Sequence, residues 1–392
     1  MNNLSENPKH HFSVWCQENV FTPHIVEGTS LLQEALDFYL LSIYQKLDLS
    51  RLLASPVSTT ELTEKLGYVD SAHLTLEALL DRLSSRYQFV QRDVKESKVF
   101  FSHIGPTPQP ARDIEDIRSE MARLGEDYLA PLEFLQFGFD VWNRALSDDP
   151  DYLDAMLSGR ESENQELWFR ATNTDPLQNV HGIMGAKAID MLLPRGRILE
   201  IGGGTGNGIR NLFQHLDSKN ELTRIEHYHF TDISAKFIMG TRHEIRENYP
   251  NVSTDWRFAD LNKPLSEQKI PQNSFDLIYA VNAAHVAKDI VGFLKSCKAT
   301  LKPGGRILFA ERIRLTPRDM APRELTLNLS VYHRTAAIRN HDYRPVHCYL
   351  SPENWLKVFE LAGFKDGDIW PDIDALSESF PNQYAAIVTA VA

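Results

Sequence analysis

Three glycines in a short turn and a carboxylate just before it are the first residues in this sequence that could do chemistry. Without a Cβ, the glycines let the backbone approach a ligand closely. The apolar residues before the turn predict a buried parallel strand, and residues 209–216 predict the helix that follows. This order typically seats a nucleoside-type cofactor. The candidate contacts are Glu200, Gly202, Gly204 and Gly206.

Acidic residues follow the next two predicted strands. The second strand ends at Asp232 and Ile233, where folds of this kind hold ribose hydroxyls. The third strand, at 256–258, precedes Asp260 and Leu261. The side chain of Asp260 and the neighbouring backbone could bind an adenine amino group. As simpler interpretations, the glycine turn could only close a strand-to-helix connection, and Asp232 could only cap a helix.

Polar side chains also follow the fourth and fifth predicted strands, at 274–280 and 306–311. The fourth opens onto Asn282 and His285, and the fifth ends at Glu311. Strands and helices alternate from the glycine turn onward, which predicts a doubly wound α/β sheet. Ligands bind at the carboxyl ends of the strands in such sheets, so these side chains are candidates for a shared site. Asn282 could equally be a turn former.

The order of these motifs resembles the class I S-adenosylmethionine-dependent methyltransferases, which have a Rossmann-like fold. The run Leu301-Lys302-Pro303-Gly304-Gly305-Arg306 is particularly similar. Within that superfamily the stretches 230–234 and 258–261 resemble the C-methyltransferase domains of polyketide synthases, a methyltransferase type 12 group. The resemblance covers roughly residues 160–370. It implies an enzyme of class EC 2.1.1 with S-adenosyl-L-methionine as cofactor.

The resemblance also implies a catalytic dyad. In the family, a histidine after strand four and a glutamate ending strand five remove the α-proton of a β-ketoacyl thioester, and His285 and Glu311 stand at the matching positions. Chemistry makes the same demand, because methylation of carbon needs a base for the C–H proton. The carboxylate would orient the imidazole and stabilise its charged form. The simpler interpretations are a solvated loop histidine and a surface glutamate.

One segment departs from the family pattern. Where those domains carry a Gly-Trp-Trp-like element, this chain has Leu329-Ser330-Val331-Tyr332-His333-Arg334. The wall facing the substrate therefore differs, and Tyr332, His333 and Asn179 are the candidate substrate contacts. Packing roles are the alternative for each.

Composition limits the remaining possibilities. The 392 residues, 42% of them hydrophobic, suffice for two packed domains, which we place at 1–150 and 151–392. No apolar run is long enough to span a membrane and no secretory pattern opens the chain, so a cytoplasmic protein is expected. Three scattered cysteines indicate neither disulfides nor a zinc cluster, and no metal is expected.

The N-terminal domain is predicted to be mainly helical and winged-helix-like. Ser58 or Thr59 should cap one helix that stops at Gly67, a second helix spans 72–84, and two short strands follow. Such modules bind DNA in some proteins and form lids or dimerisation units in others. The net charge of −12 argues against nucleic acid, which favours the second role. A homodimer is compatible with it.

These inferences predict a methyltransferase acting on a small molecule or acyl thioester, on carbon next to a carbonyl, in polyketide-type biosynthesis. The acceptor would be free or bound to a carrier protein, and arginines from 312 to 344 could form a basic patch for an acidic carrier. An O- or N-methyltransferase is the alternative enzyme. A cofactor-binding protein without catalysis, contacting a partner through its N-terminal domain, is the alternative of a different class.

Overall fold

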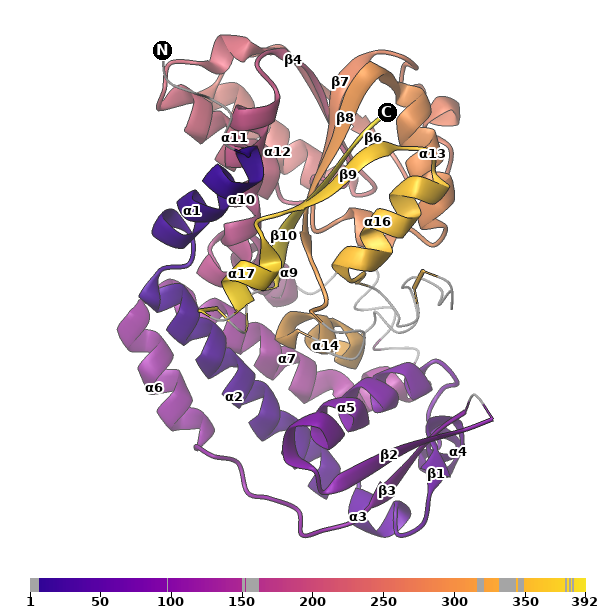
Figure 1. Cartoon of the computed structure of the whole chain (residues 1–392). Helices are drawn as coiled ribbons and strands as arrows, with labels where there is room; N and C mark the ends of the chain where they lie inside the picture. Colours follow the sequence, from indigo (N-terminus) through magenta and orange to yellow (C-terminus); the bar gives the residue numbers. More distant parts are fainter. Residues whose placement is uncertain are drawn as a thin grey trace. The chain divides into compact units, whose positions relative to one another are not determined.

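The computed structural model describes residues 7–96, 98–149, 152, 162–315, 321–330, 343–344, 349–377, 379–380, 382 and 384–392. The chain forms two compact units (Figure 1). The first, here called the sheet unit, comprises Met1–Val26, Gln178–Pro317 and Ala337–Ala392. The second, the helical unit, comprises Glu27–Leu177 and Arg318–Ala336.

The sheet unit is built on a seven-stranded sheet in the order β6-β5-β4-β7-β8-β10-β9. Strands β4 to β8 pair in parallel, whereas β10 is antiparallel to both of its neighbours. This confirms the predicted doubly wound sheet and adds two strands that the sequence analysis did not assign. The strands are β4 (Gly196–Glu200), β5 (Ile225–Asp232), β6 (Thr254–Phe258), β7 (Phe275–Val281), β8 (Leu301–Arg312), β9 (Lys365–Trp370) and β10 (Ala385–Val391).

Helices cover both faces of this sheet. On one face, a Cβ at Gly185 of α10 would lie 2.2 Å from the Tyr279 hydroxyl, so the helix packs directly on β7. On the other face, Trp355 of α16 packs edge-on against Phe309 of β8. The helices are α1 (Pro8–Asn19), α10 (Pro176–Leu192), α11 (Asn207–Asp217), α12 (Ala235–Asn248), α13 (Ile290–Thr300), α16 (Pro352–Leu361) and α17 (Ile373–Ser377), with 3₁₀ turns η2 (Leu222–Arg224), η3 (Leu265–Gln268) and η4 (Ala284–Val286).

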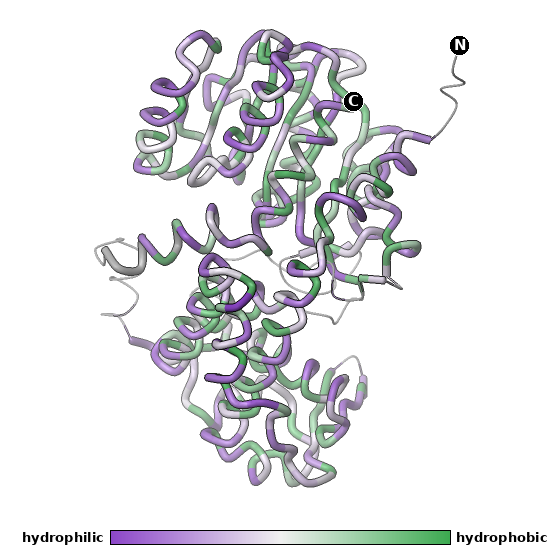
Figure 2. Tube along the Cα trace, turned by 90° about the vertical axis from the view of Figure 1, so that its left-hand side faces the viewer, coloured by the Kyte–Doolittle hydropathy of each residue, from purple (hydrophilic) through white to green (hydrophobic). Residues whose placement is uncertain are grey.

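The central strands are apolar because both faces of the sheet are covered. Every residue of β7 except Asp276 and the last, Val281, is buried, and Figure 2 shows hydrophobic stretches along the strands. Each parallel strand must then give way to a helix at the same edge. At that edge, Gly206 with φ 92° begins α11, and Ser234 caps α12 by accepting a hydrogen bond from the Phe237 N–H.

The helical unit contains the predicted winged-helix pattern. Ser58 and Glu61 form a capping box at the start of α4, and Gly67 ends that helix at φ 68°, as the sequence predicted. A three-stranded sheet in the order β1-β3-β2 completes the pattern. The elements are α2 (Pro23–Lys46), which begins in the sheet unit, α3 (Leu49–Leu52), β1 (Val57–Ser58), α4 (Thr59–Leu66), α5 (Ala72–Tyr87), β2 (Val90–Lys95), β3 (Lys98–His103), α6 (Ile114–Leu124), η1 (Glu126–Tyr128), α7 (Leu129–Leu146), α9 (Ser162–Asn173) and α14 (Pro322–Ser330).

The two units divide the chain differently from the predicted boundary at 150/151. The first helix belongs to the sheet unit, because Lys9 pairs with Asp368 at 3.0 Å and Phe12 packs on Trp370 of β9 (Figure 1). Conversely, α9 and α14 both pack on α7 in the helical unit. Contacts between segments that are separated in the sequence decide this division, and no local sequence pattern predicts them.

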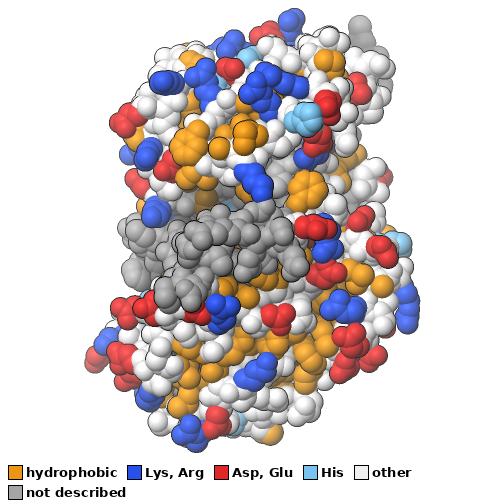
Figure 3. Space-filling model, turned by 180° about the vertical axis from the view of Figure 1, so that it is seen from behind, with side chains coloured by type: hydrophobic (Ala, Val, Ile, Leu, Met, Phe, Trp, Pro, Cys, Tyr) orange, Lys and Arg blue, Asp and Glu red, His pale blue; other side chains and the backbone are white. Residues whose placement is uncertain are grey.

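Within the described part of the chain, no helix combines the length and the apolarity needed to cross a bilayer. On the face shown in Figure 3, acidic and basic side chains are interspersed outside the grey atoms.

Candidate active site

The glycine turn after β4 adopts a conformation that leaves room for a ligand. Gly202, Gly204 and Gly206 have φ values of 62°, 54° and 92°, a region that other residues rarely enter. A Cβ at Gly202 would lie 2.7 Å from the Cβ of Ala283, whereas a Cβ at Gly204 would meet nothing closer than 4.0 Å. The turn is therefore tight toward β7 and open at Gly204.

Asp232, at the end of β5, holds this turn in place. Its Oδ2 accepts a hydrogen bond from the Gly204 N–H at 2.8 Å, and its Oδ1 accepts one from the Ser234 N–H at 2.7 Å. Burial raises the pKa of this carboxyl, and the backbone donors oppose the rise. The helix cap itself is Ser234, so Asp232 braces the connection between β5 and α12 and does not cap the helix. A second contact to ribose hydroxyls stays a prediction, and it would use the remaining lone pairs of the two oxygens.

An apolar surface lies beside Asp232. Ile233 is 60% exposed, and Phe258, which pairs with Asp232 across β5 and β6, is 57% exposed. Behind them, Asp260 is fixed by Gln268, which accepts from its N–H at 2.7 Å and donates to its carbonyl, while Leu261 packs against the core. Exposed apolar side chains next to a glycine turn suit the flat face of a nucleobase.

These observations fit a nucleoside cofactor at the carboxyl edge of β4, β5 and β6. The open position at Gly204, the carboxylate at Asp232 and the exposed Ile233 and Phe258 would receive its polar and apolar parts. Among the described residues no side chain caps the N-terminus of α11, whose positive dipole end lies at the same edge.

Glu200 lies below this turn, with its side chain in the protein interior. It is fully buried, and its Oε2 accepts a hydrogen bond from the Tyr228 hydroxyl at 2.8 Å. Its Oε1 has no hydrogen-bond partner among the described residues, and a Cβ at Gly208 would lie 2.3 Å from it. The carboxyl therefore packs under the first turn of α11, and its predicted contact with the cofactor is untested.

Glu200 should make the stability of the protein depend on pH. Burial raises its pKa to about 8, so the folded state favours the neutral carboxyl. The resulting contribution to the free energy of unfolding is fully present in acid, where the carboxyl is protonated in the unfolded chain too. It is lost as the pH rises through the pKa of the folded state. Between pH ~6 and ~9 the wild type should lose about 2–3 kcal/mol of unfolding free energy that Glu200→Gln retains. Chemical denaturation at both pH values measures this.

The control for this experiment is Glu247→Gln, which changes an exposed carboxylate on α12 and should leave the pH dependence of the wild type intact. Equal pH dependence in wild type and Glu200→Gln would show that the buried carboxyl does not titrate in this range.

His285 and Glu311 meet at the carboxyl ends of β7 and β8, as the sequence predicted. The Nδ1 of His285 lies 2.6 Å from Oε2 of Glu311, and both side chains are at most 2% exposed. The other oxygen of Glu311 accepts hydrogen bonds from the backbone N–H groups of Ala283 and Ala284, at 3.1 and 2.8 Å. Three donors therefore converge on one buried carboxylate, which fixes its orientation.

Asn282 has a structural role next to this pair. With φ 48°, it turns the chain out of β7, and its Oδ1 accepts from the Arg312 N–H at 2.7 Å, which ties the end of β7 to that of β8. Its buried Nδ2 has no hydrogen-bond partner within the described residues. Asn282 is thus a turn former, and its amide remains a candidate for ligand contact.

Two further residues contact His285, and the sequence analysis expected neither of them at this site. The ring of Tyr349 packs on the imidazole with centroids 4.0 Å apart. Arg344, 1% exposed, donates to the carbonyl oxygens of His285 at 3.3 Å and Ala287 at 2.8 Å, which holds the turn η4. Both residues come from the segment after β8, and no sequence motif in that segment predicted their contacts with His285.

Other predicted contacts differ in the structure. The Oδ1 of Asn179 accepts from Asn207 at 2.8 Å and from Asn211 at 2.9 Å, so this side chain joins α10 to α11. Tyr332 and His333 lie outside the described residues. The predicted basic patch is wrong for three of its arginines, which are buried and bonded to protein oxygens: Arg312, Arg314 and Arg344.

A comparison with known families decides the class of this site. Residues 199–307, which span the glycine turn, β5, β6, β7 and α13, match the family described as "Methyltransferase domain". This stretch is a methyltransferase domain. The predicted enzyme class, an S-adenosylmethionine-dependent methyltransferase, and its cofactor are thereby confirmed.

The curated relatives of this domain are much longer proteins. A highly reducing polyketide synthase of Pyrenophora dematioidea is 30% identical over 179 residues, and one of Aspergillus nomiae is 35% identical over 176 residues. These alignments cover 46% and 45% of this chain. The aligned region spans only 7% of the length of either relative.

Solved structures extend the likeness over nearly the whole chain. The CurJ carbon methyltransferase superposes with a TM-score of 0.74 at 18% identity, covering 98% of this chain and 99% of that one. The C-methyltransferase domain of the citrinin polyketide synthase gives 0.68 at 15% identity, covering 97% and 92%. These values confirm the predicted class I methyltransferase fold with its helical N-terminal part.

Proposed function

We propose that this methyltransferase methylates the α-carbon of a β-ketoacyl thioester, with His285 as general base and Glu311 as the residue that positions it. One observation carries the proposal: a buried imidazole lies 2.6 Å from a carboxylate that two backbone N–H groups hold in place. Methyl transfer to a carbon acid requires such a base, because the C–H proton must leave.

The chain's own residues would act as follows. Glu311 accepts a hydrogen bond from the Nδ1–H of His285, which leaves Nε2 as the basic nitrogen. Nε2 takes the α-proton, and the electron pair of the broken C–H bond forms the new C–C bond. The methyl group would come from S-adenosylmethionine bound at the glycine turn, and the electrons of its C–S bond would stay on sulfur. The proton held by His285 then passes to solvent, which restores the base.

The thioester and its carrier are proposed from the relatives. The two relatives are polyketide synthases, and the two solved structures are the CurJ carbon methyltransferase and the CMeT domain of the citrinin polyketide synthase. This favours a carrier-bound acyl chain as substrate and carbon as the methyl acceptor. Because Arg312, Arg314 and Arg344 are buried, their side chains offer no basic surface to a carrier.

Tyr349 should support the base through its ring. An aromatic face against an imidazolium stabilises the charged ring by roughly 0.5–2 kcal/mol. Tyr349→Leu should therefore lower kcat by about 2-fold to 30-fold. Tyr349→Phe keeps the ring and should stay near wild type, which separates the ring from the hydroxyl. An equal loss in both variants would assign the effect to the hydroxyl instead.

A panel of acceptors tests the proposed function. The protein is incubated with methyl-labelled S-adenosylmethionine and, in turn, with a β-ketoacyl thioester on a carrier protein, its free analogue, a phenol, a carboxylate and an amine. Transfer to a thioester is the expected result. Transfer only to the phenol, carboxylate or amine would replace the proposal with O- or N-methylation, in which the same histidine would deprotonate a heteroatom.

A further inference from the structure

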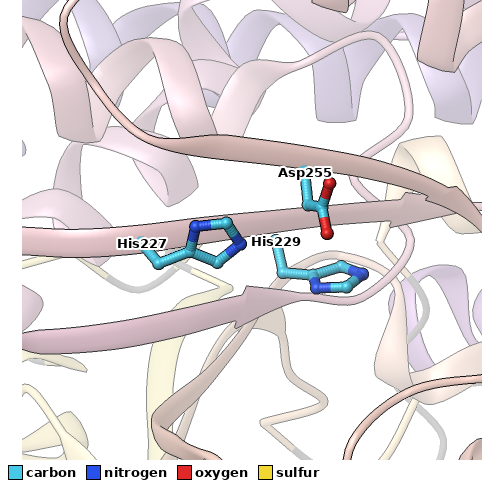
Figure 4. A group of neighbouring side chains, drawn as sticks. All are labelled: His227, His229 and Asp255. Atoms are coloured by element: carbon cyan, nitrogen blue, oxygen red, sulfur yellow. The ribbon is translucent and has the colours of Figure 1, made fainter.

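Two histidines of β5 and an aspartate of β6 meet on one face of the sheet. His227 and His229 are two positions apart on that strand, so both project from the same face. Asp255 pairs with His229 across β6. One ligand atom from each of the three residues lies within 4.8 Å of the others, and Figure 4 shows the Asp255 carboxylate directed toward the imidazoles. Asp232, which contacts the glycine turn, is the last residue of the same strand.

His229 provides an independent sign that something is bound here. Its side chain is 2% exposed, and its Nε2 has no hydrogen-bond partner in the described part of the chain. Buried polar atoms nearly always have a hydrogen-bond partner, so the lone Nε2 of His229 indicates a bound ligand. Phe275, whose ring lies edge-on to the imidazole at 5.7 Å, gives it no polar partner.

The other two side chains suit the same ligand. The Nδ1 of His227 lies 2.9 Å from the Ser253 hydroxyl, a contact of the kind that orients a metal-bound imidazole through its second nitrogen. The Asp255 side chain is 48% exposed, so an ion can reach the group from solvent.

We propose that His227, His229 and Asp255 bind one divalent transition-metal cation, with Zn²⁺ as the best fit. Two imidazoles and a carboxylate are common zinc ligands, whereas Ca²⁺ and Mg²⁺ prefer oxygen ligands alone. Three protein ligands leave a fourth position for water. The site is separate from the proposed base His285, and it departs from the expectation of no metal, which rested on the cysteines.

Arginine neighbours limit the affinity of this site. The Nη2 of Arg257 lies 3.3 Å from Oδ2 of Asp255, and Arg197 pairs with His227 across β4. Both arginines repel a cation. The ion pair between Arg257 and Asp255 is weak because both side chains are partly exposed to solvent. A metal ion can therefore displace Arg257 from the carboxylate. Removal of Arg257 should consequently tighten metal binding.

Titration of the whole chain tests the proposal. Protein stripped with a chelator is titrated with Zn²⁺ alone by calorimetry, and with Co²⁺ while visible absorption reports tetrahedral coordination. One equivalent should bind. Asp255→Asn should weaken binding by about 10-fold or more, and Arg257→Gln should tighten it. Because Asp255 is half exposed, its substitution leaves the core intact.

The matched control is His243→Ala, which removes an exposed histidine on α12 and should leave the affinity unchanged. Melting temperatures without metal verify that each variant folds. The proposal is overturned if the wild type binds no Zn²⁺, or if Asp255→Asn and His229→Asn both bind it as the wild type does, since the ion would then lie elsewhere.

Discussion

A His285→Ala variant is expected to bind S-adenosylmethionine as the wild type does and to transfer its methyl group to a β-ketoacyl thioester about 10²-fold to 10⁴-fold more slowly. The variant removes the base but leaves the glycine turn and Asp232 untouched, and these lie at other strand ends. The comparison therefore separates cofactor binding, read by calorimetry, from the chemical step, read by single-turnover transfer.

His243→Ala is the matched control, because it removes an exposed histidine and should keep full activity. An additional arm uses a thioester whose α-carbon is more acidic. Because its proton leaves more readily, the loss caused by His285→Ala should shrink. A full rate in His285→Ala on the ordinary thioester would mean that another group takes the proton.

Glu311→Gln should be nearly as damaging as loss of the histidine. One oxygen of Glu311 accepts from two backbone N–H groups, so in the variant the amide oxygen must take that place. The amide NH₂ then faces Nδ1 of His285 and can only donate to it. This pushes the imidazole proton onto Nε2, which removes the lone pair that takes the α-proton, as in the tautomer argument for catalytic triads. A loss of about 10²-fold to 10⁴-fold in kcat follows.

The geometry of the site should survive this substitution, since glutamine has the shape of glutamate. Cofactor affinity and melting temperature should therefore stay close to wild type. Glu353→Gln, on the exposed first turn of α16, serves as the control for a lost surface charge. If Glu311→Gln keeps its activity, Glu311 only anchors the turn through Ala283 and Ala284.

The parts of this fold that sequence predicted are those set by local patterns. Apolar runs placed β4, β5, β6, β7 and most of β8, and the glycines placed the cofactor turn. Ser58 and Gly67 marked the ends of α4 through capping chemistry. The alternation of these strands with helices predicted the doubly wound sheet, in which parallel strands present their carboxyl ends at one edge.

The parts that sequence missed depend on distant contacts. The apolar run 385–391 could have been recognised as a buried strand, but β9 has charged residues at three of its six positions and a glycine at a fourth, and only pairing with β10 defines it. The sequence analysis assigned the first helix to the N-terminal domain. The structure places it in the sheet unit, where Lys9 binds Asp368, a residue 359 positions away.

Site residues divide in the same way. His285 and Glu311 follow predictable strand ends, whereas Tyr349 reaches His285 from a segment without a motif. Asn179 was expected at a substrate, but two asparagines of α11 bind its carbonyl oxygen. The His-x-His pattern on β5 is a sequence signal for the proposed metal ligands, and the expectation of no metal considered only the cysteines.

The position of the transferred methyl group tests the central claim most directly. A β-ketoacyl thioester on a carrier protein is incubated with ¹³C-methyl S-adenosylmethionine and wild type or His285→Ala, and NMR locates the label. We expect a methyl group coupled to the α-proton, stable to mild base, and lost in the variant. Label that sits on oxygen, or that mild base releases as an ester, would contradict carbon methylation by a His285–Glu311 pair.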